Sequence, residues 1–430
     1  MERYKEYKDS GVQWIGEIPS HWDQRRVRYT GKSRNGLTYS PYDVSEDGEG
    51  ILVLRSSNIQ DGKLSLNDNV YVKKDISPDL MVKKGDILIC SRNGSRDLVG
   101  KLTLIDKDLE ASFGAFMMIY RTNMWAPFME KVLSVAIQSY KTLFSTSTIN
   151  QLTNDIFKDF VIPLPPLSEQ EKIVSYIESK TSKIDEYIAE KEKEVQLLNE
   201  LKEAEIAKVV TQGLNPNVKM KDSGVSWIGM IPEHWDIRRL SQVAYEHYIS
   251  NKEIHHQNLL SLSYGKIIRK DINTTEGLLP ASFDTYQIVE EGNVVMRLTD
   301  LQNDHKSLRV GLVKEEGIVT SAYVCLGIFA SMVPSYLYNV LHSYDIKKLF
   351  YSMGGGLRQN LNWQGLKKLD IPVPPKDEQR DIVSYINGKC EKITSLVSEL
   401  EAEIEHLKEY KQRLIADCVT GQVNVQNETI

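Results

Sequence analysis

Residues 8–26 read KDSGVQWIGEIPSHWDQRR and residues 221–239 read KDSGVSWIGMIPEHWDIRR, and the two stretches are identical at 15 of 19 positions. The other matched pairs are IPLPPLSEQEKIVSYI from residue 162 with IPVPPKDEQRDIVSYI from residue 371, and IAKVVTQGLN from residue 206 with IADCVTGQVN from residue 415. Matched blocks that recur in the same order are the sequence signature of an internal repeat. The chain therefore carries one structural plan twice.

A long helix is expected after each proline-rich block, where proline itself favours an extended backbone. Ser168 and Glu171 form a capping-box pattern at the start of the first helix, and Asp377 takes the cap position in the second. Both helices carry apolar residues at heptad spacing and charged outer faces, a pattern typical of a coiled coil. The recurring apolar positions are Ile173, Ile177, Ile184, Ile188, Val195 and Leu198 in the first helix, and Ile382, Ile386, Ile393, Val397, Leu400, Ile404, Leu407 and Leu414 in the second.

The two helices are expected to pair with each other as an antiparallel rod of roughly 60 Å, because ~40 residues rise 1.5 Å each. The alternative, that each is a core helix of a bundle, is less favoured because both share one heptad phase. The expected fold class is therefore α+β: two globular α/β domains separated by a two-helix coiled coil with pseudo-two-fold symmetry. The expected segments are 1–16 (N-terminal segment), 17–162 (first domain), 163–213 (central helix), 214–229 (linker), 230–371 (second domain), 372–421 (C-terminal helix) and 422–430 (tail).

Between the matched blocks, about 140 residues in each half show little identity. Turns of Gly, Asn and Asp separate short β-rich runs there, such as ILVLR from residue 51 and LRVGLV from residue 308. A faint common frame remains, because VKKGDILIC at 82–90 aligns with VEEGNVVMR at 289–297. The two segments are expected to share a fold and to differ in their loops.

Polar residues gather in the loops that follow these strands. Arginine pairs with guanine, and asparagine or glutamine with adenine, in the DNA major groove, while serine, threonine and lysine suit phosphates. Any single one of these residues could equally be an ordinary solvated loop residue, so the hypothesis rests on their clustering. The candidate DNA-contacting residues are Arg55, Ser57, Asn58, Arg92, Asn93, Ser95, Lys101 and Asn150 in the first half, and Lys266, Arg297, Thr299, Gln302, Asn303, Arg309, Arg358, Gln359 and Asn360 in the second.

The histidines of the first repeated block, His21 and His234, invite interpretation as ligands. No other ligand residue stands at a metal spacing, so a metal site built on them has no support. Trp14, Ile15 and Trp22, with their copies, are instead spaced to fill a joint between a globular domain and a helix. We favour this structural interpretation of the block.

Composition argues against several classes of protein. The four cysteines, Cys90, Cys325, Cys390 and Cys418, form no C-x-x-C pair, which favours a reducing cytoplasm over a disulfide framework or zinc ribbon. The polar first residues indicate no secretory signal, and the most apolar stretch, residues 320–333, is too short to span a membrane. We therefore expect a cytoplasmic protein. A net charge of −6 does not predict nucleic-acid binding, although a local basic surface would suffice for it.

Taken together, these residues resemble the specificity subunit of type I restriction–modification systems. The resemblance covers nearly the whole chain and rests on the SGVxWIGxIPxHW blocks, the IPxPPxxEQxxIVxYI blocks and the long helix after each. It implies two target recognition domains, each reading one half of a split double-stranded DNA site, with the paired helices setting the spacer. It also implies two modification subunits docked along the helices, and two restriction subunits that join them. The expected docking residues are Ile184, Ile188, Val195, Ile393, Val397 and Ile404.

The resemblance further implies that this chain binds no cofactor and catalyses no reaction. S-adenosylmethionine, ATP and magnesium would be bound by the partner subunits. The sequence contains no G-x-x-x-x-G-K-[ST] loop, no Asn-Pro-Pro-[Phe/Tyr] tetrad and no G-x-G-x-x-G fingerprint. A nuclease or self-contained methyltransferase would require such a motif or an acidic metal cluster.

The main alternative is a coiled-coil adaptor with two protein-binding domains and no role on DNA. The polar loops have diverged between the two halves while the frame has stayed nearly identical, which weighs against this alternative. A preference for bipartite DNA sites distinguishes the two functions.

Overall fold

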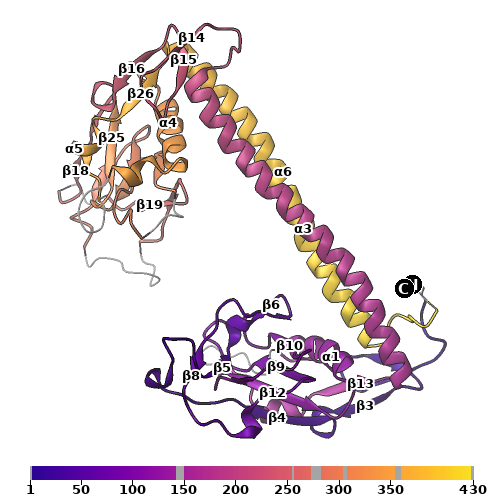
Figure 1. Cartoon of the computed structure of the whole chain (residues 1–430). Coiled ribbons are helices and arrows are strands. Elements are labelled where there is room, and N and C mark those ends of the chain that lie inside the picture. The colour runs from indigo at the N-terminus through magenta and orange to yellow at the C-terminus, as the bar shows by residue number, and fades with distance from the viewer. Residues whose placement is uncertain are drawn as a thin grey trace. The chain divides into compact units, whose positions relative to one another are not determined.

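The computed structural model describes residues 2–141, 150–253, 256–272, 282–303, 308–353 and 360–427 (Figure 1). The chain divides into two compact units. Residues 1–191 and 403–430 form the first unit, and residues 192–402 form the second. Each unit holds one globular domain and a section of both long helices, so the units are described in turn.

The first unit is built on a four-stranded sheet in the order β10-β9-β12-β4, beside a three-stranded sheet in the order β11-β5-β8. All residues of β9 are buried, which suits its position between two antiparallel neighbours. The buried Asp86 at its start is paired by Arg121, whose Nε and Nη2 donate to it at 2.7 and 2.6 Å. The strands are β4 (Gly31–Asn35), β5 (Ile51–Leu54), β8 (Tyr71–Val72), β9 (Asp86–Cys90), β10 (Leu102–Leu104), β11 (Ala111–Phe113) and β12 (Met117–Thr122).

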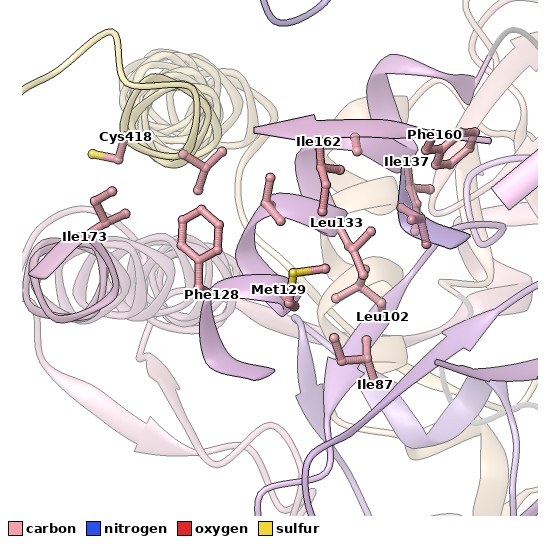
Figure 2. Close-up of a cluster of buried hydrophobic side chains, with 14 of the residues drawn as sticks. Ile87, Leu102, Phe128, Met129, Leu133, Ile137, Phe160, Ile162, Ile173 and Cys418 are labelled. Carbon is pink, nitrogen blue, oxygen red and sulfur yellow. The ribbon is translucent and has the colours of Figure 1, made fainter. Parts of the chain in front are cut away.

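Helix α1 (Ala126–Ser139) covers the larger sheet with apolar side chains that recur three and four residues apart. Figure 2 shows this core, in which Ile173 and Cys418 of the two long helices lie beside Phe128 of α1. The helix pair thus shares its core with the globular domain of this unit. The other labelled members are Ile87, Leu102, Met129, Leu133, Ile137, Phe160 and Ile162.

The second unit repeats this plan with a sheet in the order β17-β25-β22-β23 and a second sheet in the order β18-β21-β24. Strand β22 follows β9 by 207 residues, and both lie between two antiparallel neighbours, so the common frame predicted for residues 82–90 and 289–297 is confirmed. Helix α4 corresponds to α1. The elements are β17 (Ala244–Glu246), β18 (Ile249–Ser250), β21 (Gln287–Val289), β22 (Val294–Met296), β23 (Val310–Leu312), β24 (Gly317–Val319), β25 (Val324–Ile328) and α4 (Pro334–Ile346).

The repeated blocks form short antiparallel strand pairs at the same place in both units. β1 pairs with β2 and β3 with β13 in the first unit, as β14 pairs with β15 and β16 with β26 in the second. Their bounds are β1 (Tyr7–Asp9), β2 (Glu17–Pro19), β3 (Asp23–Arg26), β13 (Val161–Leu164), β14 (Met220–Asp222), β15 (Met230–Pro232), β16 (Asp236–Arg239) and β26 (Asp370–Val373). The remaining elements are β6 (Ile59–Gln60), β7 (Lys63–Leu64), α2 (Asn154–Lys158), β19 (Leu260–Ser263), β20 (Lys266–Arg269) and α5 (Trp363–Leu366).

The long helices are α3 (Leu167–Gln212) and α6 (Lys376–Val419), and they run antiparallel within each unit. In the first unit Lys411 Nζ lies 2.5 Å from Asp185 Oδ1, and Lys191 Nζ lies 3.2 Å from Glu403 Oε2. In the second unit the Tyr385 hydroxyl donates to Glu205 at 2.6 Å. The predicted coiled-coil pairing is confirmed. The structure does not support the alternative, in which each long helix is a core helix of a bundle.

The long helices already begin at Leu167 and Lys376, one residue before the predicted cap residues, so Ser168 and Asp377 lie inside the first turn and are not caps. The carbonyl of Pro166 accepts the amides of Glu169 and Gln170, which starts α3 directly at the proline block. None of the described helices is long and apolar enough to cross a membrane.

Residues 2–22 of the first unit pack against the segment that follows α6. The Tyr7 hydroxyl donates to the carbonyl of Gly421 at 2.8 Å, and Gln422 Nε2 donates to the carbonyl of Glu17 at 2.6 Å. In the second unit the equivalent strand pair follows α3 along the chain, through residues 213–219. A noncovalent contact in one unit thus replaces a chain connection in the other.

Candidate nucleic-acid interface

The loop after β9, residues 91–96, is held firmly by the tip that precedes β12. The carbonyl of Phe116 accepts the backbone amides of Ser91 and Arg92 at 2.9 and 3.1 Å and the Ser91 hydroxyl at 3.0 Å. This arrangement follows from the register of the sheet, in which Cys90 at the end of β9 lies opposite Met117 at the start of β12. The predicted residues Arg92, Asn93 and Ser95 therefore project from a rigid base.

Two more predicted segments join this loop. Asn93 Nδ2 donates to Ser56 Oγ at 3.3 Å, which brings the loop after β5 beside it. Arg92 forms an isolated β-bridge with Gln151, and the Leu152 amide donates to the carbonyl of Ser91 at 2.8 Å. The structure thus gathers Arg55, Ser57, Arg92, Asn93, Ser95 and Asn150 into one surface region of the first unit.

The second unit gathers its predicted residues in the same way. The Leu361 amide donates to the carbonyl of Leu298 at 2.9 Å, the counterpart of the contact between Leu152 and Ser91. The amide of Asp300 donates to Asn360 Oδ1 at 2.9 Å. The predicted residues Arg297, Thr299, Gln302, Asn303 and Asn360 therefore belong to one loop cluster after β22.

Arg309 and Asn58 are placed inside the protein, which corrects their assignment as base-reading side chains. Arg309 is fully buried, and its guanidinium donates to the carbonyls of Arg297 and Thr299 at 3.1 and 2.9 Å. Asn58 is also fully buried and donates to the carbonyl of Ser65 at 2.9 Å. Their side chains donate hydrogen bonds to backbone carbonyls of the loops, because buried polar groups need partners. Both residues shape the candidate surface from beneath.

The other predicted residues fall in different places. Lys101 lines a cavity of about 700 Å³ between α1, α3 and α6 in the first unit, together with Ser134 and Gln412. Lys266 is exposed at the tip of the β19–β20 hairpin, whose Gly265 carbonyl accepts the Tyr338 hydroxyl at 3.3 Å. Arg358 and Gln359 lie outside the described residues.

The predicted docking residues need a correction as well. Ile188, Ile393 and Ile404 are only 8%, 6% and 6% exposed, because the heptad seam is used inside the chain. Ile184, Val195 and Val397 are half-buried, and Ile184 packs against the core of the first unit. The buried Ile188, Ile393 and Ile404 therefore leave almost no surface for a docked partner, whereas docking on Val195 and Val397 stays a prediction.

Sequence reasoning missed a basic hollow on the first unit, lined by the exposed side of β4 and its neighbours. The hollow has a volume of about 650 Å³. Arg34 faces Asp79 at 2.9 Å, and Arg28 is paired with Asp159. The alternating run GKSRN of β4 carried the signal, since alternate residues of a strand share one face. The cationic residues that line the hollow are Arg28, Lys32, Arg34, Arg121 and Lys158.

The repeated tryptophan block is a structural joint, as predicted. The indole nitrogens of Trp22 and Trp235 donate to Glu169 and Glu378, each in the first turn of a long helix. His21 Nε2 lies 2.6 Å from Glu169 Oε1. Both tryptophans are fully buried. The motif therefore fastens each globular domain to a helix.

The cysteines are poorly suited to thiol chemistry. Burial raises the pKa of Cys90 to about 11 and the pKa values of Cys325 and Cys418 to about 12. A thiol held in its protonated form is a weak nucleophile. These residues serve as small apolar side chains of the core.

The sequence matches the family described as the type I restriction modification DNA specificity domain over residues 19–197 and 314–406. The chain belongs to this family. One relative is a protein of Methanocaldococcus jannaschii that is provisionally named the type I restriction enzyme MjaX specificity subunit. It is 26% identical over 453 residues, and the match covers 99% of this chain and 99% of the relative. The MjaVIII specificity subunit of the same organism is 25% identical over 446 residues, covering 99% of this chain and 98% of the relative.

A solved structure of a type I restriction–modification system contains a chain with the same fold. The TM-score is 0.65 at 16% sequence identity, and the match covers 94% of this chain and 99% of that one. This likeness supports the arrangement of two α/β domains and paired long helices.

Proposed function

We propose that each globular domain of this chain reads one half of a bipartite DNA site for a type I restriction–modification complex. The observation that carries the proposal is the equivalence of the two loop clusters. The loops after β9 and β22 are fixed by matching hydrogen bonds, from Leu152 to Ser91 and from Leu361 to Leu298. The side chains on these matching frames differ, with Arg92 where the second unit has Thr299. Equal frames with unequal side chains suit two different half-sites.

The partners we propose are double-stranded DNA, two modification subunits and two restriction subunits. The chain itself would bind no cofactor and carry out no catalysis. S-adenosylmethionine, ATP and magnesium would be held by the other subunits. The membership of the family supports a role in DNA specificity, and the sequence offers no nucleotide-binding or methyltransferase motif.

For the modification subunits, we propose docking on apolar side chains that remain exposed on the helix pair. In the first unit Tyr187 and Tyr410 are 42% and 49% exposed. The residues 209 positions away in the repeat are Leu396 and Leu201, which are 40% and 50% exposed in the second unit. Each unit thus presents one apolar residue from each helix at equivalent positions. Two identical partners can use two such patches equally.

Domain replacement tests the division of the DNA site. Residues 23–161 are exchanged for the aligned segment of a relative, and the complex with the modification subunit is used to methylate genomic DNA. Sequencing of methylated adenines should show one altered half-site and one unchanged half-site. A motif altered in both halves, or binding of all duplexes equally in a gel-shift assay, would contradict the proposal and favour the adaptor alternative.

A further inference from the structure

Arg92 differs from most exposed arginines of the first unit. Arg26 and Arg28 are paired with Asp159, and Arg34 is paired with Asp79. Among the described residues, no carboxylate lies within ion-pair distance of the exposed Arg92 guanidinium. Its Cζ instead lies 5.3 Å from the centroid of the Phe116 ring. The donors of this guanidinium are directed to no acidic partner in the described part of the chain.

The platform beneath Arg92 is rigid and yet open to solvent. Phe116 is 59% exposed, an unusual position for a large aromatic side chain at the end of a buried strand. Its own carbonyl accepts the amides of Ser91 and Arg92, so the backbone segments that carry the ring and the guanidinium are held together. The bridge from Arg92 to Gln151 holds the same backbone from the other side. A loop whose backbone is already fixed loses little backbone freedom when it binds.

We propose that Arg92, supported by the ring of Phe116, reads a guanine in the half-site bound by the first globular domain. A guanidinium offers two parallel N–H donors, and the major-groove edge of guanine offers the matching acceptors N7 and O6. Contact of the guanidinium face with an aromatic ring leaves those edge donors available. Phe116 is thus a positioning residue for Arg92. This inference rests on the function proposed above.

The second unit lacks this pair. The residues 207 positions later are Thr299 and Tyr323. Thr299 has one hydroxyl and no fork of donors, so it cannot make a bidentate contact with guanine. The carbonyl of Tyr323 accepts the side-chain amide of the buried Gln287 at 2.7 Å, whereas the carbonyl of Phe116 accepts the amides of Ser91 and Arg92. A guanine contact made by this arginine–aromatic pair is therefore expected in the first half-site only.

The test uses the full chain in complex with its modification subunit and a DNA library randomised in both half-sites. Methylation rates are compared between sites that carry guanine and sites that carry each other base at every position. Arg92→Ala should lower the preference for guanine by about 5- to 150-fold at one position, with the other half-site unchanged. Arg92→Lys should keep part of the preference, and Phe116→Leu should weaken it by a smaller factor than Arg92→Ala.

Arg413→Ala, at an exposed arginine of α6 outside both loop clusters, is the matched control and should leave the guanine preference unchanged. Because the readout is a ratio of rates on paired DNA sites, a general loss of activity does not imitate the expected result. A guanine preference that survives Arg92→Ala, in a complex that still reads a bipartite site, would overturn this inference alone. A wild-type complex without any bipartite motif would overturn the proposed function as well.

Discussion

The indole N–H of Trp22 donates a hydrogen bond of 3.0 Å to Glu169 Oε2, and so links the first repeated block to the first turn of α3. Trp235 and Glu378 make the same contact at 3.1 Å in the second unit. Both indoles are fully buried, so each depends on its glutamate for a hydrogen-bond partner.

Replacing either glutamate should destabilise the unit that contains it. Glu169→Leu leaves the Trp22 N–H buried without an acceptor, at a cost of about 1–3 kcal/mol. Denaturant unfolding of the full chain measures the effect, with Glu171→Leu at an exposed position of the same helix as the control. Adding Trp22→Phe should recover part of the loss. Equal stabilities of Glu169→Leu and the control would contradict this account of the joint.

The helix pair should act as the ruler of the DNA spacer. Inserting seven residues in both α3 and α6 keeps the apolar seam in phase and lengthens each helix by roughly 10 Å. The bases read should stay the same while the spacer between the half-sites grows. Sequencing of methylated adenines checks this, and an unchanged spacer in a stable, active variant would refute the ruler.

Docking of the modification subunits should depend on the exposed apolar pairs. Tyr187→Ser with Tyr410→Ser should weaken binding of one partner copy by about 5- to 150-fold, since exposed aromatic anchors carry much of the energy of such interfaces. Leu201→Ser with Leu396→Ser should weaken binding of the other copy. For each double variant on its own, native mass spectrometry should find complexes with one modification subunit.

The matched control replaces Glu192 and Glu401 by serine. These are exposed residues at equivalent positions of the two helices, 209 residues apart in the sequence. This variant should bind two partner copies. Loss of both copies in the control, or retention of both in the apolar variants, would count against the proposed patches.

Stability of the second unit should fall in mild acid because of His342 on α4. Burial, and to a lesser degree the charge of Lys202, lowers the pKa of His342 to about 4. The unfolded chain takes up this proton below its ordinary pKa of about 6.5, whereas the folded chain resists it down to about 4. Stability from this group is therefore complete above pH 6.5 and declines by about 3 kcal/mol as the pH falls to 4.

His342→Gln removes the titrating ring and should flatten this part of the pH profile. Denaturant titrations of both proteins between pH 4 and pH 7 give the comparison. His406, an exposed histidine on α6, provides the control, and His406→Gln should leave the profile unchanged. The same acid dependence in His342→Gln and the wild type would assign the effect to other groups.

Much of the frame could be predicted from the sequence because repetition and heptad spacing are local signals. The matched blocks located the joints, and the apolar positions of α3 and α6 predicted the pair. The direction of single side chains depends on tertiary contacts and was harder to predict. Arg309 looked like a reading residue because it follows a loop, yet its guanidinium turns inward to the carbonyls of Arg297 and Thr299.

Two further residues show the same limit from opposite sides. Phe116 directly precedes the buried strand β12, and no pattern in the sequence indicated that its ring is exposed beside Arg92. Ile188 was expected to contact a partner subunit, but it is buried in the apolar seam between α3 and α6 of the same chain. Heptad spacing identifies an interface without naming the helix that fills it.

Within the first unit, residues 2–22 and the segment after α6 come from opposite ends of the sequence and are joined by hydrogen bonds. In the first unit a hydrogen bond joins Tyr7 of β1 to Gly421 after α6, whereas in the second unit the chain itself runs from α3 to β14. A gene rearranged to begin with the second half and to continue into the first would encode the same set of contacts. Exchange of halves between related genes, by simple recombination within the repeats, would then yield new pairs of half-sites on an unchanged scaffold.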